Sequence, residues 1–149
     1  MDSSIVLIIE DQQLVANSMA VWLRQAGYEV EVAADSRAAL ELASRRKIGA
    51  VLLDWHLSDR ALTAPHLIDA LHARCGQATP ILVVSGDWGA FSNSARTAAT
   101  DYLHKPFTPD DLLRKVGTYF AVRPPSSRER PPRWRSSASA RARQRAPSD

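Results

Sequence analysis

The sequence predicts an α/β fold in which a five-stranded parallel sheet is doubly wound by five helices. Apolar runs alternate with segments of helical periodicity five times along the chain. Several of these runs are continuous, as expected of strands buried on both faces of a parallel sheet. The connections are short, and right-handed crossovers leave few other topologies. A chain of 149 residues with 45% apolar composition is long enough for one packed core.

The expected elements follow from these patterns. Strands are predicted at residues 5–9, 28–33, 50–53, 81–84 and 102–104. Helices are expected over residues 12–26 and 35–46, after Thr63, over 89–99 and after Thr108. The first helix should bury Val15, Met19, Trp22 and Leu23 and end at Gly27. Asp35, Thr63 and Thr108 are of a type that caps helix starts, and Pro65 and Pro109 suit a first turn.

Polar residues stand where four of the predicted strands end. Glu10 and Asp11 follow the first strand, Asp54 the third and Ser85 the fourth, and Lys105 follows the fifth. Ligand sites of open α/β sheets lie at the carboxyl ends of the strands. We therefore expect three carboxylates, one hydroxyl and one ammonium to meet at one edge of the sheet.

This set of groups suits phosphoryl transfer. Clustered carboxylates repel one another, and a hard divalent cation such as Mg²⁺ relieves the repulsion and also binds phosphate oxygens. Asp54 could attack phosphorus to form an acyl phosphate, with Ser85 hydrogen-bonded to a phosphoryl oxygen and Lys105 balancing its charge. Each residue alone has a structural interpretation, as a helix cap, a turn or a solvated strand end. We favour the functional interpretation over the structural one because all four positions coincide at one edge.

Four segments resemble the motifs of response-regulator receiver domains, over about residues 4–121. They are Glu10-Asp11, Val51-Leu52-Leu53-Asp54, Val83-Val84-Ser85-Gly86 and Asp101-Tyr102-Leu103-His104-Lys105-Pro106-Phe107. The resemblance implies a flavodoxin-like strand order 2-1-3-4-5 and Asp54 as phospho-acceptor. It also implies Mg²⁺ held by Glu10, Asp11, Asp54 and the backbone carbonyl of His56.

The resemblance also implies how the domain signals. Ser85 and Tyr102 would be switch residues that alter the face made by helix four, strand five and helix five, where a dimer is possible. Tyr102 could equally be an aromatic side chain packed at the sheet edge. The Lys105-Pro106 bond is expected to be cis. The partners would be a histidine kinase or histidine phosphotransfer protein, and the domain would be a signalling module in a phosphorelay rather than an enzyme.

The sequence departs from the family pattern at several positions. Ser58 replaces the usual proline, and no glycine follows in residues 59–62. Ala98 occupies a common glycine position, and Glu10 replaces the more frequent aspartate. Asp87, two residues past Ser85, adds negative charge near the site, and we hypothesise that it tunes the lifetime of the acyl phosphate.

The composition changes after Val122. Residues 123–149 contain eight Arg against two carboxylates, a net charge of +6, so residues 1–122 carry −3 of the chain's total of +3. We expect a receiver domain over residues 1–122 and a disordered Arg, Pro and Ser-rich tail over 123–149. With so short a tail, the chain is expected to be a single-domain regulator. The single Cys75 and the absence of signal-peptide or membrane-spanning patterns indicate a cytoplasmic location.

Two other functions compete with the phosphorylated receiver. The Arg-rich tail, with Trp134 among its arginines, could bind nucleic acid, although a solvated tail is the simpler expectation. A pseudo-receiver that is never phosphorylated would act only as an interaction module, but every named site position is filled. His66 and His72 are expected to be surface residues of the third helix.

Overall fold

The computed structural model describes residues 4–57, 62–87 and 99–121. It contains one five-stranded sheet of order β2-β1-β3-β4-β5, in which every pair is parallel. The strands are β1 Ile5–Ile9, β2 Val30–Ala33, β3 Ile48–Asp54, β4 Ile81–Ser85 and β5 Asp101–His104. The helices are α1 Gln13–Gln25, α2 Ser36–Arg45, α3 Ala64–Cys75 and α5 Pro109–Tyr119. The predicted fold class and strand order are confirmed.

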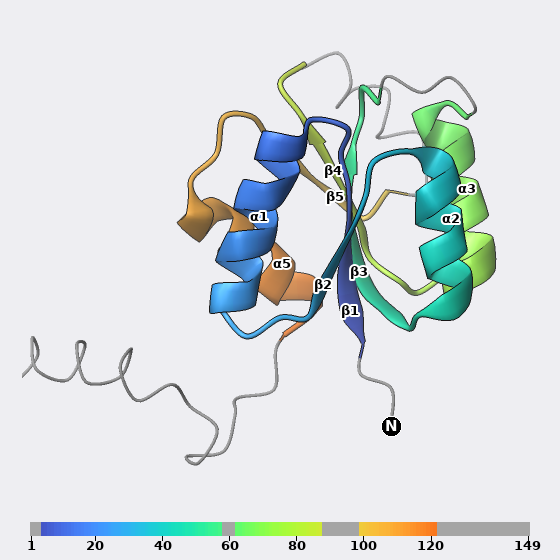
Figure 1. Cartoon of the computed structure of the whole chain (residues 1–149), viewed down its shortest axis with the longest axis horizontal. Coiled ribbons are helices and arrows are strands. Elements are labelled where there is room, and N and C mark those ends of the chain that lie inside the picture. The colour runs from blue at the N-terminus through green and yellow to red at the C-terminus, as the bar shows by residue number, and fades with distance from the viewer. Residues whose placement is uncertain (1–3, 58–61, 88–98, 122–149) are drawn as a thin grey trace, which may run out of the picture.

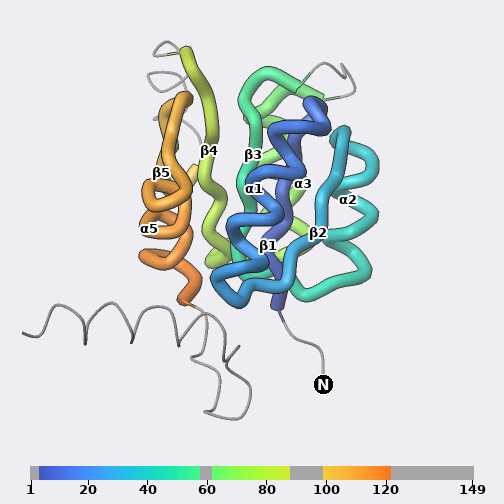
Figure 2. The backbone as a smooth tube through the Cα atoms, turned by 60° about the vertical axis from the view of Figure 1, so that its left-hand side comes forward, coloured from blue at the N-terminus to red at the C-terminus, as the bar shows by residue number. Residues whose placement is uncertain are grey.

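Helices cover both faces of this sheet (Figure 1). The tube view in Figure 2 shows the same order of strands from β2 to β5. Helices α1 and α5 pack against one face, and α2 and α3 pack against the other. Alternate residues of β1 serve the two cores, because successive side chains of a strand point to opposite faces. Ile5, Leu7 and Ile9 join the α2–α3 core, and Val6 and Ile8 join the α1–α5 core.

Some sequence-based boundaries and faces differ from the structure. β2 begins at Val30 instead of Tyr28, and β3 begins at Ile48 and includes Asp54. Helix α1 buries Ala16 and Ala20 with Met19 and Leu23, whereas Val15 and Trp22 are only half-buried. The two alanines form part of the contact face, which places that face slightly further round the helix than the large side chains alone indicate.

His72 is buried, not exposed, so the expectation of a surface residue is wrong. Only 5% of the residue is exposed, and its Nε2 lies 3.2 Å from the carbonyl oxygen of Thr79. His72 follows Leu71 on the buried face of α3, where the loop before β4 closes over it. His66 is exposed, as expected.

The predicted helix starts are largely confirmed. The Asp35 carboxylate accepts a hydrogen bond of 2.8 Å from the Ala38 amide at the start of α2. Thr108 and Asp111 form a reciprocal capping box at α5. Thr63 precedes α3, but its hydroxyl contacts His66 Nδ1 at 2.9 Å instead of a backbone amide.

Several expectations fall outside the described residues. They concern the fourth helix, the loop that contains Ser58, and the domain boundary and tail after Val122. None of the helices in the described parts of the chain is long and apolar enough to cross a bilayer.

Candidate functional site

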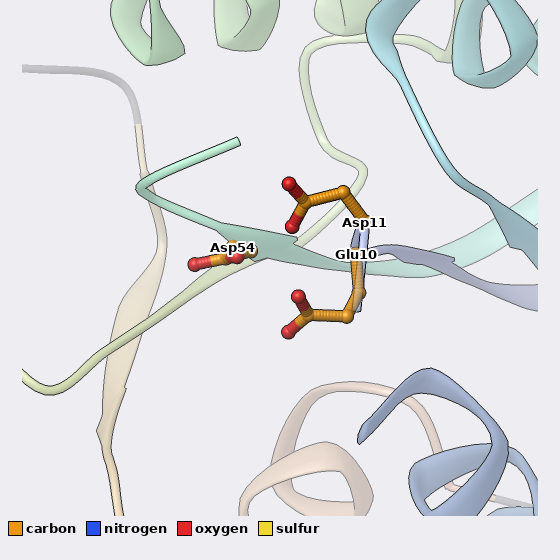
Figure 3. Close-up of side chains that lie close together, drawn as sticks. All are labelled: Glu10, Asp11 and Asp54. Carbon is orange, nitrogen blue, oxygen red and sulfur yellow. The ribbon is translucent and has the colours of Figure 1, made fainter. Parts of the chain in front are cut away.

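The carboxyl edge of the sheet brings three acidic side chains together (Figure 3). Glu10 and Asp11 directly follow β1, and Asp54 is the last residue of the neighbouring strand β3. Each offers one carboxylate oxygen, and these oxygens all lie within 4.8 Å of one another. The two strands run in register, with Ile9 beside Leu53, so their polar ends meet at the same level.

Most of the site is removed from solvent. Glu10 is 2% exposed, Asp54 is 7% exposed and Ser85 is 1% exposed, whereas Asp11 is half-buried. Burial disfavours charged carboxylates unless other groups compensate. The cluster therefore needs a cation, a proton or hydrogen-bond donors to be stable.

Lys105 supplies one positive charge. Its Nζ lies 3.2 Å from Glu10 Oε1 and 3.8 Å from Asp54 Oδ1. The Lys105-Pro106 peptide bond is cis, as the resemblance implied. One ammonium group against three carboxylates leaves the site with an excess of negative charge. A divalent cation fits this excess, and carboxylate oxygens are ligands that Mg²⁺ prefers.

The same crowding changes the acidity of Glu10. Its pKa rises from 4.5 to about 7, mainly because the carboxyl is buried; the neighbouring Asp54 acts in the same direction, while the Gln12 amide and Lys105 oppose the change. The Gln12 amide donates to Glu10 Oε2 at 3.2 Å. Without a metal ion, Glu10 is therefore protonated in a substantial fraction of molecules near neutral pH.

Backbone amides and Ser85 complete the edge. The His56 amide donates to Asp54 Oδ1 at 3.2 Å, and the Asp87 amide donates to Ser85 Oγ at 3.0 Å. Ser85 ends β4, which pairs with both β3 and β5, so its hydroxyl stands between Asp54 and Lys105 in the strand order. All five predicted site residues thus lie at one edge of the sheet.

A contact between His56 and Asp87 was not foreseen from the sequence. His56 Nε2 lies 3.4 Å from Asp87 Oδ2, and both side chains are more than half exposed. Each residue follows a site residue by two positions, His56 after Asp54 and Asp87 after Ser85. This equal offset could have indicated the contact from the sequence. Strands β3 and β4 are neighbours in the sheet, so the residues that follow them lie side by side.

Tyr102 occupies a half-buried position in β5. It pairs with Val83 of β4, and its ring packs against the α2–α3 core. The structure thus shows the Tyr102 ring in a single, inward-packed position. The proposed switch role of Tyr102, like the role of the His56 carbonyl as a ligand, stays a prediction.

The response regulator receiver domain family matches residues 6–117 of the chain. The chain therefore belongs to this family of two-component signalling proteins. Receiver domains are signalling modules that are phosphorylated on an aspartate and bind Mg²⁺ in their active site, and they interact with histidine kinases or phosphotransfer proteins.

Curated relatives are similar over the receiver region only. The transcriptional regulatory protein CutR of Streptomyces coelicolor is 35% identical over 115 residues, which is 74% of this chain and 51% of CutR. An NtrX-like response regulator of Rickettsia felis is 30% identical over 110 residues, which is 72% of this chain and 23% of that protein. The chain thus spans from about a quarter to about half of the length of these relatives.

Solved receiver structures share the fold. The chemotaxis protein CheY4 of Vibrio cholerae is 28% identical, with a TM-score of 0.71 over 78% of this chain and 98% of CheY4. The receiver domain of a sensor histidine kinase from Pseudomonas aeruginosa is 26% identical, with a TM-score of 0.71 over 80% of this chain and 99% of that domain. The latter structure has a magnesium ion coordinated in its active-site cleft.

Proposed function

We propose that this chain is a response regulator receiver domain that accepts a phosphoryl group on Asp54. The donor would be a phosphohistidine of a histidine kinase or histidine phosphotransfer protein. The observation that carries the proposal is the convergence of the Glu10, Asp11 and Asp54 carboxylates, within 4.8 Å, beside the Lys105 ammonium.

The chemistry follows from this arrangement. A carboxylate oxygen of Asp54 attacks phosphorus, an O–P bond forms, and the P–N bond of the phosphohistidine breaks as the imidazole leaves. Lys105 Nζ, 3.8 Å from Asp54 Oδ1, balances charge on the phosphoryl oxygens. The hydroxyl of Ser85 would hydrogen-bond one of these oxygens.

Mg²⁺ would be held by Glu10, Asp11, Asp54 and the backbone carbonyl of His56. The three carboxylates fit such an ion in type and in spacing. When bound, the ion would neutralise charge on the phosphoryl group and on the ligands. The output is a phosphorylation-dependent change in partner binding, with Ser85 and Tyr102 as the switch and the face around β5 and α5 as the surface affected.

Intact-mass measurement tests the proposal directly. The protein is incubated with Mg²⁺ and acetyl phosphate, and a mass gain of one phosphoryl group is expected. Asp54→Asn should abolish the gain, because an amide oxygen is a poor nucleophile. Asp69→Asn, which removes an exposed carboxylate from α3, is the control and should be phosphorylated normally. No gain in the unaltered protein under any condition would favour the pseudo-receiver.

A further inference from the structure

Cations gather around the C-terminal ends of α2 and α3, away from the carboxylate site. Two adjoining grooves lie there and share Arg74. The first is lined by Arg37, Leu40, Glu41, Ser44, Arg45 and Arg74. The second runs past Arg46, Lys47, Ile48, Gly49, Arg74, Cys75, Ala78, Thr79 and Pro80. This concentration of positive charge contrasts with the net charge of −3 on residues 1–122.

The cations of these grooves differ in whether they are already paired. Arg46 forms ion pairs with Glu29 and Glu31, and Arg37 lies 4.0 Å from Glu41. Arg45, Lys47 and Arg74 are exposed, and no carboxylate among the described residues pairs with them. We call these three residues the basic strip. The nearby carboxylates are thus engaged by other cations, and the basic strip is available to an external anion.

The shape of the basic strip favours an extended anion over a compact one. Helix C-termini present carbonyl oxygens, which repel an anion placed against the backbone. Arg45 and Arg74 extend from the ends of α2 and α3, and Lys47 stands just before β3. Their long side chains can instead reach separate phosphates along a polymer. Nucleic acid supplies such a polymer, since duplex DNA carries about one charge per 1.7 Å of its axis. Among the described residues, no aromatic side chain lines either groove, so these residues offer no base stacking there.

We propose that the basic strip binds the phosphate backbone of nucleic acid without sequence preference. This binding goes beyond phosphoryl transfer and does not depend on it. The seven residues of β3 separate its start near Lys47 from Asp54 by about 20 Å. That distance exceeds the Debye length of about 8 Å at physiological salt, so charge at Asp54 has little influence on the strip.

Fluorescence anisotropy of the full chain tests the proposal, with labelled duplex DNA and single-stranded RNA of arbitrary sequence as probes. The double variant Arg45→Gln/Arg74→Gln removes two phosphate contacts. For duplex DNA we expect the slope of log K against log salt to fall by about 1.8, and affinity at about 0.1 M NaCl to fall roughly tenfold or more.

Two further variants separate local from general charge effects. Arg114→Gln/Lys115→Gln on α5 changes the net charge equally and should lower affinity by less than about twofold. Asp54→Asn should bind as tightly as the unaltered chain, which keeps this test independent of the proposed phosphorylation. Thermal melting of each variant checks that the fold is retained.

Several results would overturn the inference. The protein could fail to bind either probe at low salt. The strip and α5 variants could lose affinity equally, or the strip variant could keep its full affinity. A loss of binding only when Arg141, Arg143 and Arg145 are changed to Gln would assign the activity to the tail alone. If the protein bound polyglutamate as tightly as nucleic acid, the strip would recognise anionic polymers in general, and the assignment to nucleic acid would be wrong.

Discussion

Glu10 is a buried acid that the metal-free protein stabilises in its protonated form. Its pKa is about 7 in the folded chain against an ordinary 4.5, with burial as the main cause. A raised carboxyl pKa stabilises the fold fully below pH 4.5, and this contribution is lost as pH rises through about 7. A pKa shift of this size corresponds to a loss of roughly 3 kcal/mol.

We therefore predict that the metal-free protein loses stability between pH 5 and pH 8. Urea unfolding in EDTA measures this change. Glu10→Gln should remove most of the loss, because the amide does not ionise. Equal pH dependence in both proteins would contradict the assignment to Glu10. Added Mg²⁺ should weaken the dependence in the unaltered protein, since it favours the ionised carboxylate.

Asp87 is the second residue with a specific expectation. It lies beside the site, its amide donates to Ser85 Oγ, and its carboxylate faces His56 at 3.4 Å. If Asp87 tunes the acyl-phosphate lifetime, Asp87→Ala should change the rate of dephosphorylation after the donor is removed. Asp69→Ala is a matched exposed control. A time course of intact mass that is the same for Asp87→Ala and the unaltered protein would refute this role.

The residues that sequence reasoning placed correctly are those fixed by topology. Glu10, Asp11, Asp54, Ser85 and Lys105 each stand at a strand end, and parallel strands bring such ends to one edge. His72 was missed because a polar residue was expected to be exposed, although it lies four positions after Ile68 on the buried face of α3. The His56–Asp87 contact was missed because its only signal is the equal offset of the two residues from Asp54 and Ser85.

Among the elements, α5 and the start of β3 are joined by an aromatic contact. The Phe120 ring lies where a side chain at Gly49 would be, and the Tyr28 hydroxyl donates to the Phe120 carbonyl at 2.7 Å. Tyr28 and Phe120 also pack together, with ring centroids 5.6 Å apart. The end of α5 is thus held against the sheet and against the turn after α1.

Two glycine substitutions should have opposite effects on stability. A methyl group at Gly49 would overlap the Phe120 ring, so Gly49→Ala should destabilise the fold by about 1–3 kcal/mol. Gly117 lies inside α5, where an added methyl would be 3.7 Å from the Tyr28 hydroxyl, an ordinary contact. Gly117→Ala should therefore stabilise the fold by about 0.5–1 kcal/mol. Urea midpoints for both variants decide the question, and a shift of the same sign in both would contradict this account.

At the scale of elements, the sequence predicted type better than extent. Continuous apolar runs identified β1, β3 and β4, and capping residues located the starts of α2 and α5. Tyr28 looked like a strand residue because alternation continues through it, yet its side chain is used to contact Phe120. The contact face of α1 was shifted because Ala16 and Ala20 carry little hydrophobic signal but fit closely against the sheet.

Across the whole molecule, the two ends of the sheet have different charge. The carboxyl edge holds the acidic site, and the opposite end holds the basic strip near the start of β3. The β3 strand, buried along most of its length, connects them. Net charge alone conceals this arrangement, since the total of −3 on residues 1–122 sums the acidic edge and the basic strip.

The contact between Lys105 and Glu10 has a consequence for protein synthesis. It joins residues 95 positions apart, and the strands that carry them are separated in the sheet by β3 and β4. A ribosome must therefore release nearly the whole domain before the acidic edge acquires its ammonium group. Contacts of such long sequence separation also form late and slowly during folding. Under the proposed function, we expect an incomplete chain to expose Asp54 without its charge partner and to accept no phosphoryl group.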